Sequence, residues 1–176
     1  MKRRSVAIVA SIAFVVVVAL SGFLATRHPV TDASSINSPL LGHLAPAASG
    51  RSLDGRVISL ASWRGDVVVL NFWASWCNPC IQEAPELSTF AWDQRLNHVK
   101  VLGVIFNDDV ASARQFQSTY GSLYPSLIDL NGQIANAYGV TAPPTTFVIN
   151  SRGVIVATLV GATSAHQLNQ IVSEVS

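Results

Sequence analysis

Charged residues are scarce in this chain and balanced in sign. Of its 176 residues, 12% are Asp, Glu, Lys or Arg, and 11 basic side chains stand against 10 acidic ones. A formal net charge of +1 provides no strong field of either sign. The sequence therefore predicts neither a nucleic-acid surface nor a strongly acidic partner. The length favours one folded domain.

Cysteine is scarcer still, with only Cys77 and Cys80, both in the stretch ASWCNPC. A structural zinc site needs two more ligands, and the four histidines are scattered with no ligand-spaced pair, so no metal is predicted. An inert disulfide remains an alternative, but it gains little here, because loop-closure entropy grows with loop length and this loop is very short. The spacing favours a redox-active dithiol that needs no other cofactor.

One long run lacks charge altogether. No charged side chain lies between Ser5 and Thr26, and three basic residues at positions 2 to 4 precede the run. As a helix this run spans roughly 33 Å at about 1.5 Å per residue, enough for a bilayer core. The basic residues predict that the N-terminus stays in the cytoplasm and that the remainder is exported.

Three segments are expected from this pattern. Residues 1–26 are predicted to be a signal-anchor or transmembrane segment, 27–44 a Ser- and Pro-rich extracytoplasmic tether, and 45–176 the folded domain. A single-pass membrane protein with an extracytoplasmic domain follows. Cleavage at a small-x-small site such as Ala19-Leu20-Ser21 is the alternative, and it would make the domain secreted.

Apolar runs of strand length alternate with helical patterns in the predicted domain. Continuous apolar runs indicate buried strands, and Asp54-Gly55 between short alternating runs indicates an N-terminal hairpin. The pattern predicts an α/β fold with a mixed central sheet flanked by helices. Strands are expected within 51–60, 66–74, 99–106, 124–130 and 145–161, and helices after Cys77 and within 108–121, 131–140 and 163–175.

Cys77 falls where a buried strand gives way to a helix. Free amide N–H groups and the helix dipole favour a thiolate there. A free cysteine thiol has a pKa of about 8.5, and CxxC motifs at the start of a helix lower this pKa to about 7 or below. Cys77 is predicted to be the exposed nucleophile and Cys80, one turn further on, the resolving thiol.

The stretch VVVLNFWASWCNPCIQEAP resembles the active-site strand and helix of thioredoxin-like proteins. In detail it is similar to the exported, membrane-anchored thiol–disulfide reductases of the TlpA/ResA/CcmG group. The likeness runs from about Leu41 to the C-terminus and includes YGVTAPPTTFVINSRGVIV. It implies a thioredoxin-like fold, with a central helix–strand insert between Phe106 and Tyr138.

The resemblance also implies a substrate-binding surface. Pro144 falls where such proteins have a cis-proline loop facing the dithiol, with backbone free to pair with a substrate strand. Because Pro143 precedes it, either X–Pro bond is a candidate, and the position directly before the strand favours Pro144. Thr145 completes the loop, and Trp76 is expected to shield the dithiol and offer a flat surface to substrates.

Glu83 matches the acidic residue that this group keeps beside its dithiol. A carboxylate there raises cysteine pKa values by like-charge repulsion and can relay the proton of the resolving thiol. A solvated helix residue is the alternative interpretation. Asn71 stands where plain thioredoxin has a buried aspartate, which shifts the proton-relay role towards Glu83.

The resemblance implies an extracytoplasmic reductant, recharged by a membrane electron carrier of the CcdA/DsbD kind. The implied substrate is apocytochrome c, and the cysteine pair of copper-site proteins is a second substrate class. A DsbA-like oxidase or isomerase is an alternative, although the large helical insert of such oxidases is absent. A Sco-like copper-binding chaperone is another, with His166 as a downstream ligand, although Sco sites use CxxxC. A peroxidase fits less well, because Cys77 lies outside a PxxxTxxC setting.

Overall fold

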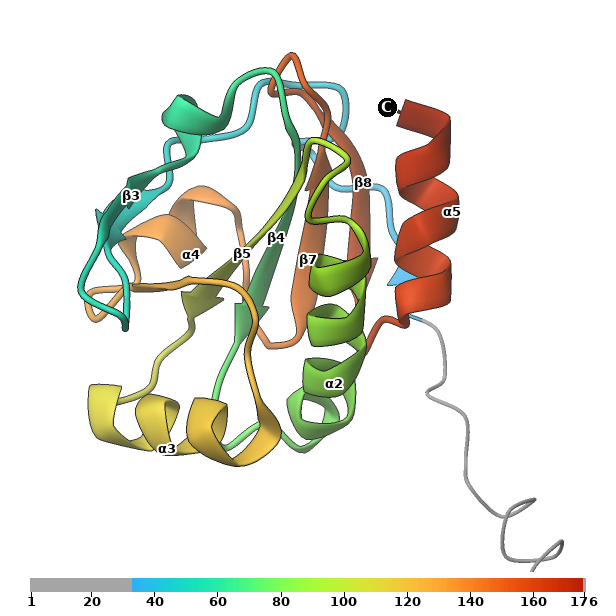
Figure 1. The fold of residues 1–176 in the computed structure, drawn as a ribbon. Coiled ribbons are helices and arrows are strands. Elements are labelled where there is room, and N and C mark those ends of the chain that lie inside the picture. Colours follow the sequence, from blue (N-terminus) through green and yellow to red (C-terminus); the bar gives the residue numbers. More distant parts are fainter. Residues whose placement is uncertain (1–32, 176) are drawn as a thin grey trace, which may run out of the picture.

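The computed structural model describes residues 33–175, so the predicted anchor, 1–26, lies outside the described residues. A six-stranded sheet in the order β1-β8-β7-β4-β5-β6 forms its centre (Figure 1). The strands are β1 (Ser34–Ser35), β4 (Val67–Trp73), β5 (Val99–Ile105), β6 (Ser126–Ile128), β7 (Thr145–Ile149) and β8 (Ile155–Val160), with β2 (Ser49–Arg51) and β3 (Val57–Ser59) as a separate hairpin. The helices are α2 (Asn78–Asp93), α3 (Val110–Tyr120), α4 (Gln133–Ala137) and α5 (Ala165–Val175).

The sheet is mixed, as predicted. β4 pairs in parallel with β5, and β5 in parallel with β6. β7 runs antiparallel to both β4 and β8, and β1 runs antiparallel to β8. The predicted insert contains α3, β6 and α4, and β6 extends the sheet beyond β5. This is the thioredoxin-like fold expected from the sequence.

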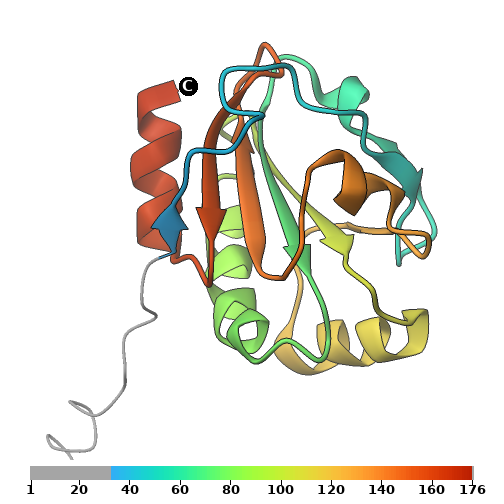
Figure 2. The ribbon, with the colours of Figure 1, turned by 180° about the vertical axis from the view of Figure 1, so that it is seen from behind.

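Helices cover both faces of the sheet, which explains why all seven residues of β4 are buried. α2 and α5 lie on one face, whereas α4 and the hairpin lie on the other (Figures 1 and 2). Val67 and Val69 pack with residues of α2 and α5, whereas Val68, Leu70 and Phe72 pack with residues of α4 and β3. Successive side chains of a strand point to opposite faces, so a continuous apolar run is what this position requires.

The prediction that residues 27–44 form a tether is wrong for residues 33–44, the part of this segment that the structure describes. Residues 33–44 pack along the domain: β1 pairs with β8, and the Ile36 N–H donates to the Thr158 carbonyl oxygen at 3.0 Å. Further along, the Gly42 N–H donates to the Ile155 carbonyl oxygen at 2.8 Å. These bonds cover backbone that would otherwise form an exposed sheet edge. The packed domain therefore includes Ala33 and does not begin at residue 45.

Within residues 33–175, no helix combines the length and the apolar character that a membrane span requires.

Candidate active site

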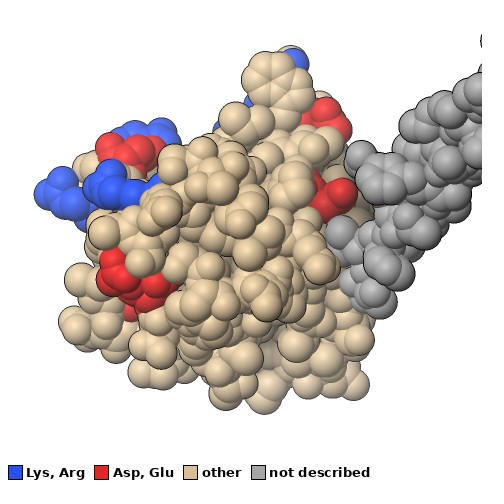
Figure 3. Space-filling model, turned by 90° about the horizontal axis from the view of Figure 1, so that it is seen from below, with Lys and Arg blue, Asp and Glu red and all other residues tan. Residues whose placement is uncertain are grey.

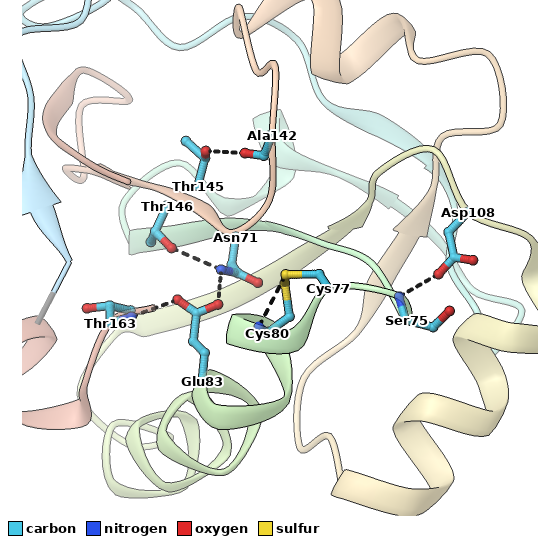
Figure 4. Close-up of a disulfide and its surroundings, with 10 residues drawn as sticks. All are labelled: Asn71, Ser75, Cys77, Cys80, Glu83, Asp108, Ala142, Thr145, Thr146 and Thr163. Carbon is cyan, nitrogen blue, oxygen red and sulfur yellow. Dashed lines mark hydrogen bonds between the residues drawn. A yellow bond between two sulfur atoms is a disulfide. The ribbon is translucent and has the colours of Figure 1, made fainter. Parts of the chain in front are cut away.

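The two cysteines lie at the start of α2, directly after β4, where the sequence predicted them. Cys77 is the N-cap residue, and its Sγ accepts a hydrogen bond from the Cys80 backbone N–H at 3.2 Å. The two residues form a disulfide, with Cα atoms 5.2 Å apart (Figure 4). Pro79 fits the first turn because it has no N–H to leave unpaired. Contrary to the expectation of an exposed nucleophile, Cys77 is only 4% exposed and Cys80 1%.

Glu83 lies inside the protein, which rules out a solvated helix residue. Its side chain is 1% exposed, and both carboxylate oxygens have partners (Figure 4). Oε2 accepts a hydrogen bond from Asn71 Nδ2 at 2.9 Å, and Oε1 accepts one from the Thr163 backbone N–H at 3.0 Å. Burial raises the pKa of Glu83 to about 7, whereas the two hydrogen bonds act in the opposite direction.

Asn71 links this carboxylate to the strand that follows the proline loop. Its Nδ2 also donates to Thr146 Oγ1 at 2.9 Å. Asn71 and Thr146 are register partners in β4 and β7, so the amide lies between α2 and the second residue of β7. The neutral amide replaces the aspartate of plain thioredoxin with a donor, leaving Glu83 as the buried acid of this region. The proton-relay role that the sequence analysis assigns to Glu83 stays a prediction.

The peptide bond between Pro143 and Pro144 is cis, which is the bond that the sequence favoured. The loop is held at both ends. The Pro144 carbonyl accepts a hydrogen bond from the Gly161 N–H at 3.0 Å, and Thr145 Oγ1 donates to the Ala142 carbonyl at 2.8 Å. Thr145 is buried and its hydroxyl is used within the loop, so any contact of Thr145 with substrate would come through its backbone.

Trp76 presents its ring to solvent, with 56% of the residue exposed, next to the buried disulfide. Its Nε1–H donates to the Asn107 carbonyl at 3.1 Å. The preceding residue, Ser75, donates its backbone N–H to Asp108 Oδ2 at 2.6 Å. The loop between β4 and α2 is thus fastened to the loop between β5 and α3.

From the sequence, Asp108 is placed only at the start of the helix expected within 108–121 and has no part in the predicted site. Asp109 is the residue that caps α3, since its Oδ1 accepts hydrogen bonds from the Ala111 and Ser112 N–H groups. A helix needs only one N-cap residue, so a second acid beside it was a signal in the sequence that Asp108 has another partner. Thr163 gave no signal of its own, because its contact with Glu83 is made by the backbone.

No metal site accompanies the cysteines in the described range. Among residues 33–175, no three His, Cys, Asp or Glu side chains are grouped so that they could hold a metal ion.

Comparison with known proteins decides the family. The profile of the AhpC/TSA family matches residues 41–158. The chain belongs to that family. Thiol-disulfide oxidoreductase ResA of Bacillus subtilis is 30% identical over 160 residues, 91% of this chain and 87% of that protein. ResA of Geobacillus thermodenitrificans is 28% identical over 170 residues, 97% of this chain and 96% of that protein.

A solved structure shares the arrangement. The crystal structure of a DsbE-type thiol:disulfide interchange protein from Chlorobium tepidum covers 77% of this chain and 96% of its own, with 28% identity and a TM-score of 0.72. The resemblance to the TlpA/ResA/CcmG group is confirmed by these relatives. The chain is a thiol–disulfide oxidoreductase with a thioredoxin-like fold.

Proposed function

We propose that this chain is an extracytoplasmic reductant, in which the Cys77–Cys80 dithiol reduces disulfides of other proteins. The observation that carries the proposal is the buried carboxyl of Glu83, one helical turn beyond Cys80, whose pKa burial raises to about 7. A carboxylate near the dithiol disfavours the thiolates by like-charge repulsion. Strong oxidants instead stabilise their reduced form through a very acidic thiol. Glu83 therefore favours a reductant over a DsbA-like oxidase.

The reaction uses the two thiols in sequence. The Cys77 thiolate attacks one sulfur of the substrate disulfide, forming a mixed disulfide and releasing the other substrate sulfur as a thiolate. Cys80 then loses its proton and attacks Cys77 Sγ, which releases the second substrate thiolate. Two electrons pass to the substrate, and the enzyme is left with the Cys77–Cys80 disulfide. Glu83 titrates near neutral pH, so it can accept the Cys80 proton at this step.

The surface at which α2 begins carries little charge. Seen from below, charged side chains lie along its upper, left and right margins, and the middle is uncharged (Figure 3). We expect a substrate to be held mainly by the cis-proline loop and by contact with Trp76, since Pro144 has no N–H and its carbonyl already accepts a hydrogen bond from Gly161. The proposed substrate is apocytochrome c, with the cysteine pair of copper-site proteins as the second class.

The proposal includes a source of electrons and a location. A membrane electron carrier of the CcdA/DsbD kind would reduce the Cys77–Cys80 disulfide after each turnover. The uncharged run before Thr26 would anchor the chain, with the catalytic domain on the extracytoplasmic side. The family relationship and the charge pattern of the N-terminal sequence support this assignment.

A single-turnover assay tests the reaction. The reduced full-length chain is mixed with an oxidised peptide that contains CxxCH, and free thiols are counted on both molecules. One peptide disulfide should be reduced for each Cys77–Cys80 disulfide formed. Cys80→Ser should accumulate the mixed disulfide, and Cys77→Ser should form none. An unreacted peptide disulfide, together with rapid oxidation of the dithiol peptide by the oxidised chain, would contradict the proposal.

A further inference from the structure

The side chain of Gln167, in the first turn of α5, joins two segments that are far apart in the sequence. Its Oε1 accepts hydrogen bonds from the Ala33 backbone N–H at 3.1 Å and from Thr163 Oγ1 at 2.8 Å. Its Nε2 donates to the Ala33 carbonyl at 2.8 Å. The amide therefore pairs with both backbone groups of Ala33, as a neighbouring strand would, and holds Thr163 at the same time.

Thr163 continues this connection into the active site. Its side chain is fully buried, and its backbone N–H donates to Glu83 Oε1 at 3.0 Å (Figure 4). An unbroken series of hydrogen bonds thus leads from Ala33 through Gln167 and Thr163 to Glu83. Ala33 is the first residue that the structure describes, directly before the strand β1 that pairs with β8.

The contact with Thr163 matters because few polar groups stabilise the ionised form of Glu83. Besides Thr163, only Asn71 donates to the carboxylate among the described residues. The titratable group that senses the Glu83 charge is Tyr124, whose pKa is raised by burial and by that charge. Cys77 and Cys80 are joined in a disulfide and do not titrate in the oxidised chain. A hydrogen bond to a carboxylate weakens steeply when its distance or angle deteriorates. Movement of the turn before α5 would therefore make Glu83 harder to ionise.

A second carboxylate also holds this turn. Glu86, on α2, accepts a hydrogen bond from the Ala165 N–H at 2.9 Å. The turn is thus fixed to α2 by Glu86, and to the N-terminal segment by Gln167. Either contact could fix the position of Thr163, and variants of Gln167 distinguish them.

We propose that Gln167 is a positioning residue that makes the contact between Thr163 and Glu83 depend on docking of the N-terminal segment at Ala33. Lifting of Ala33 and β1 from β8 removes two hydrogen bonds from Gln167 and loosens Thr163. The importance of this link for catalysis rests on the proposed function, in which Glu83 accepts the proton of Cys80. The existence of the link does not depend on that function.

The test follows the ionisation of Glu83 in the oxidised full-length chain. The carboxyl carbon of Glu83 is monitored by NMR as a function of pH and is assigned by its loss in Glu83→Gln. We expect Gln167→Ala to raise the midpoint by at least about 0.5 pH unit, because a hydrogen bond to the ionised form is weakened. Gln170→Ala, at an exposed position on the same helix, should leave the midpoint unchanged. An unchanged midpoint in Gln167→Ala would show that Glu86 alone positions the turn and would overturn the proposal.

The dependence on the N-terminal segment is tested separately at Ala33. Ala33→Pro removes the backbone N–H that donates a hydrogen bond to Gln167 Oε1, whereas Ala33→Val enlarges the side chain and keeps that N–H. We expect Ala33→Pro to raise the midpoint in the direction of Gln167→Ala, and to raise it more than Ala33→Val does. Equal midpoints for the two Ala33 variants would contradict the coupling. These titrations need no substrate, so their outcome is independent of the peptide-reduction assay.

Discussion

At the scale of single residues, the site combines a buried disulfide with a buried acid. Glu83 is held by one side-chain donor from β4 and one backbone donor from the turn before α5. Two hydrogen bonds do not compensate for removal from water, so the net effect is a raised pKa. A buried carboxyl group with a raised pKa can exchange a proton near neutral pH. Its ionised form, however, lowers the free energy of unfolding of the protein.

This cost predicts a pH-dependent stability. The folded state binds the proton of Glu83 more tightly than the unfolded chain does, so the free energy of unfolding should fall as pH rises from about 4.5 to about 7. The loss should be on the order of 3 kcal/mol and complete above the folded-state pKa. Denaturant titrations of the oxidised chain from pH 4 to 8 measure it.

Two variants separate Glu83 from other titrating groups. Glu83→Gln should remove this part of the pH dependence, because the amide does not titrate. Glu174→Gln, at an exposed position near the C-terminus, should retain the wild-type slope. Parallel curves for Glu83→Gln and the wild type would show that Glu83 does not carry the effect.

At the scale of elements, the active-site loop is fastened to a neighbouring loop and does not rest on α2 alone. The Ser75 N–H donates to Asp108, and Trp76 donates to the Asn107 carbonyl. Asn107 has a φ of 44°, a left-handed conformation that is uncommon outside glycine. Together these contacts hold Trp76 next to Cys77 while its ring stays open to solvent.

Removal of the Asp108 carboxylate should loosen this loop. Asp108→Ala leaves the Ser75 N–H without its charged acceptor, a bond worth about 1.5–3 kcal/mol. The exchange rate of the Ser75 amide hydrogen should therefore rise at least about tenfold. Asp93→Ala, at an exposed site on α2, serves as the control and should leave that rate unchanged. Equal exchange rates in the two variants would contradict a role for Asp108 in holding the loop.

The sequence predicted the elements that have a local signal. The apolar run of β4, in which Asn71 is the one polar residue, the switch to a helical pattern after Cys77 and the turn at Asp54-Gly55 are all signals from neighbouring residues. The hydrogen bond between Gln167 and Ala33 spans 134 residues of the chain, and the one between Glu83 and Thr163 spans 80 residues. Hydrophobic periodicity carries no information about such partners, so these features required the structure.

At the scale of the whole molecule, the N-terminal segment from Ala33 to Leu44 is part of the fold. This stretch has a polar composition and no sustained hydrophobic period, and both features predicted a tether. Its order comes from backbone hydrogen bonds to β8 and to the turn before β8. Side-chain patterning does not report on such bonds.

A truncation experiment tests this packing. A chain that begins at Ala45 should unfold at a lower temperature than one that begins at Ala33, because the edge of β8 loses its partners. Loss of several backbone hydrogen bonds at about 0.5–1.5 kcal/mol each predicts a decrease of roughly 5–10 °C. Thermal unfolding followed by circular dichroism measures the difference. Equal midpoints would mean that residues 33–44 do not stabilise the domain.

The reduction potential of the Cys77–Cys80 pair tests the central claim of a reductant most directly. It is obtained by equilibrating the full-length chain with glutathione or dithiothreitol buffers and counting the free thiols. We expect a potential near or below about −230 mV, towards the value of thioredoxin. A potential near about −120 mV, as in DsbA, would contradict the assignment and make the chain an oxidase that forms disulfides.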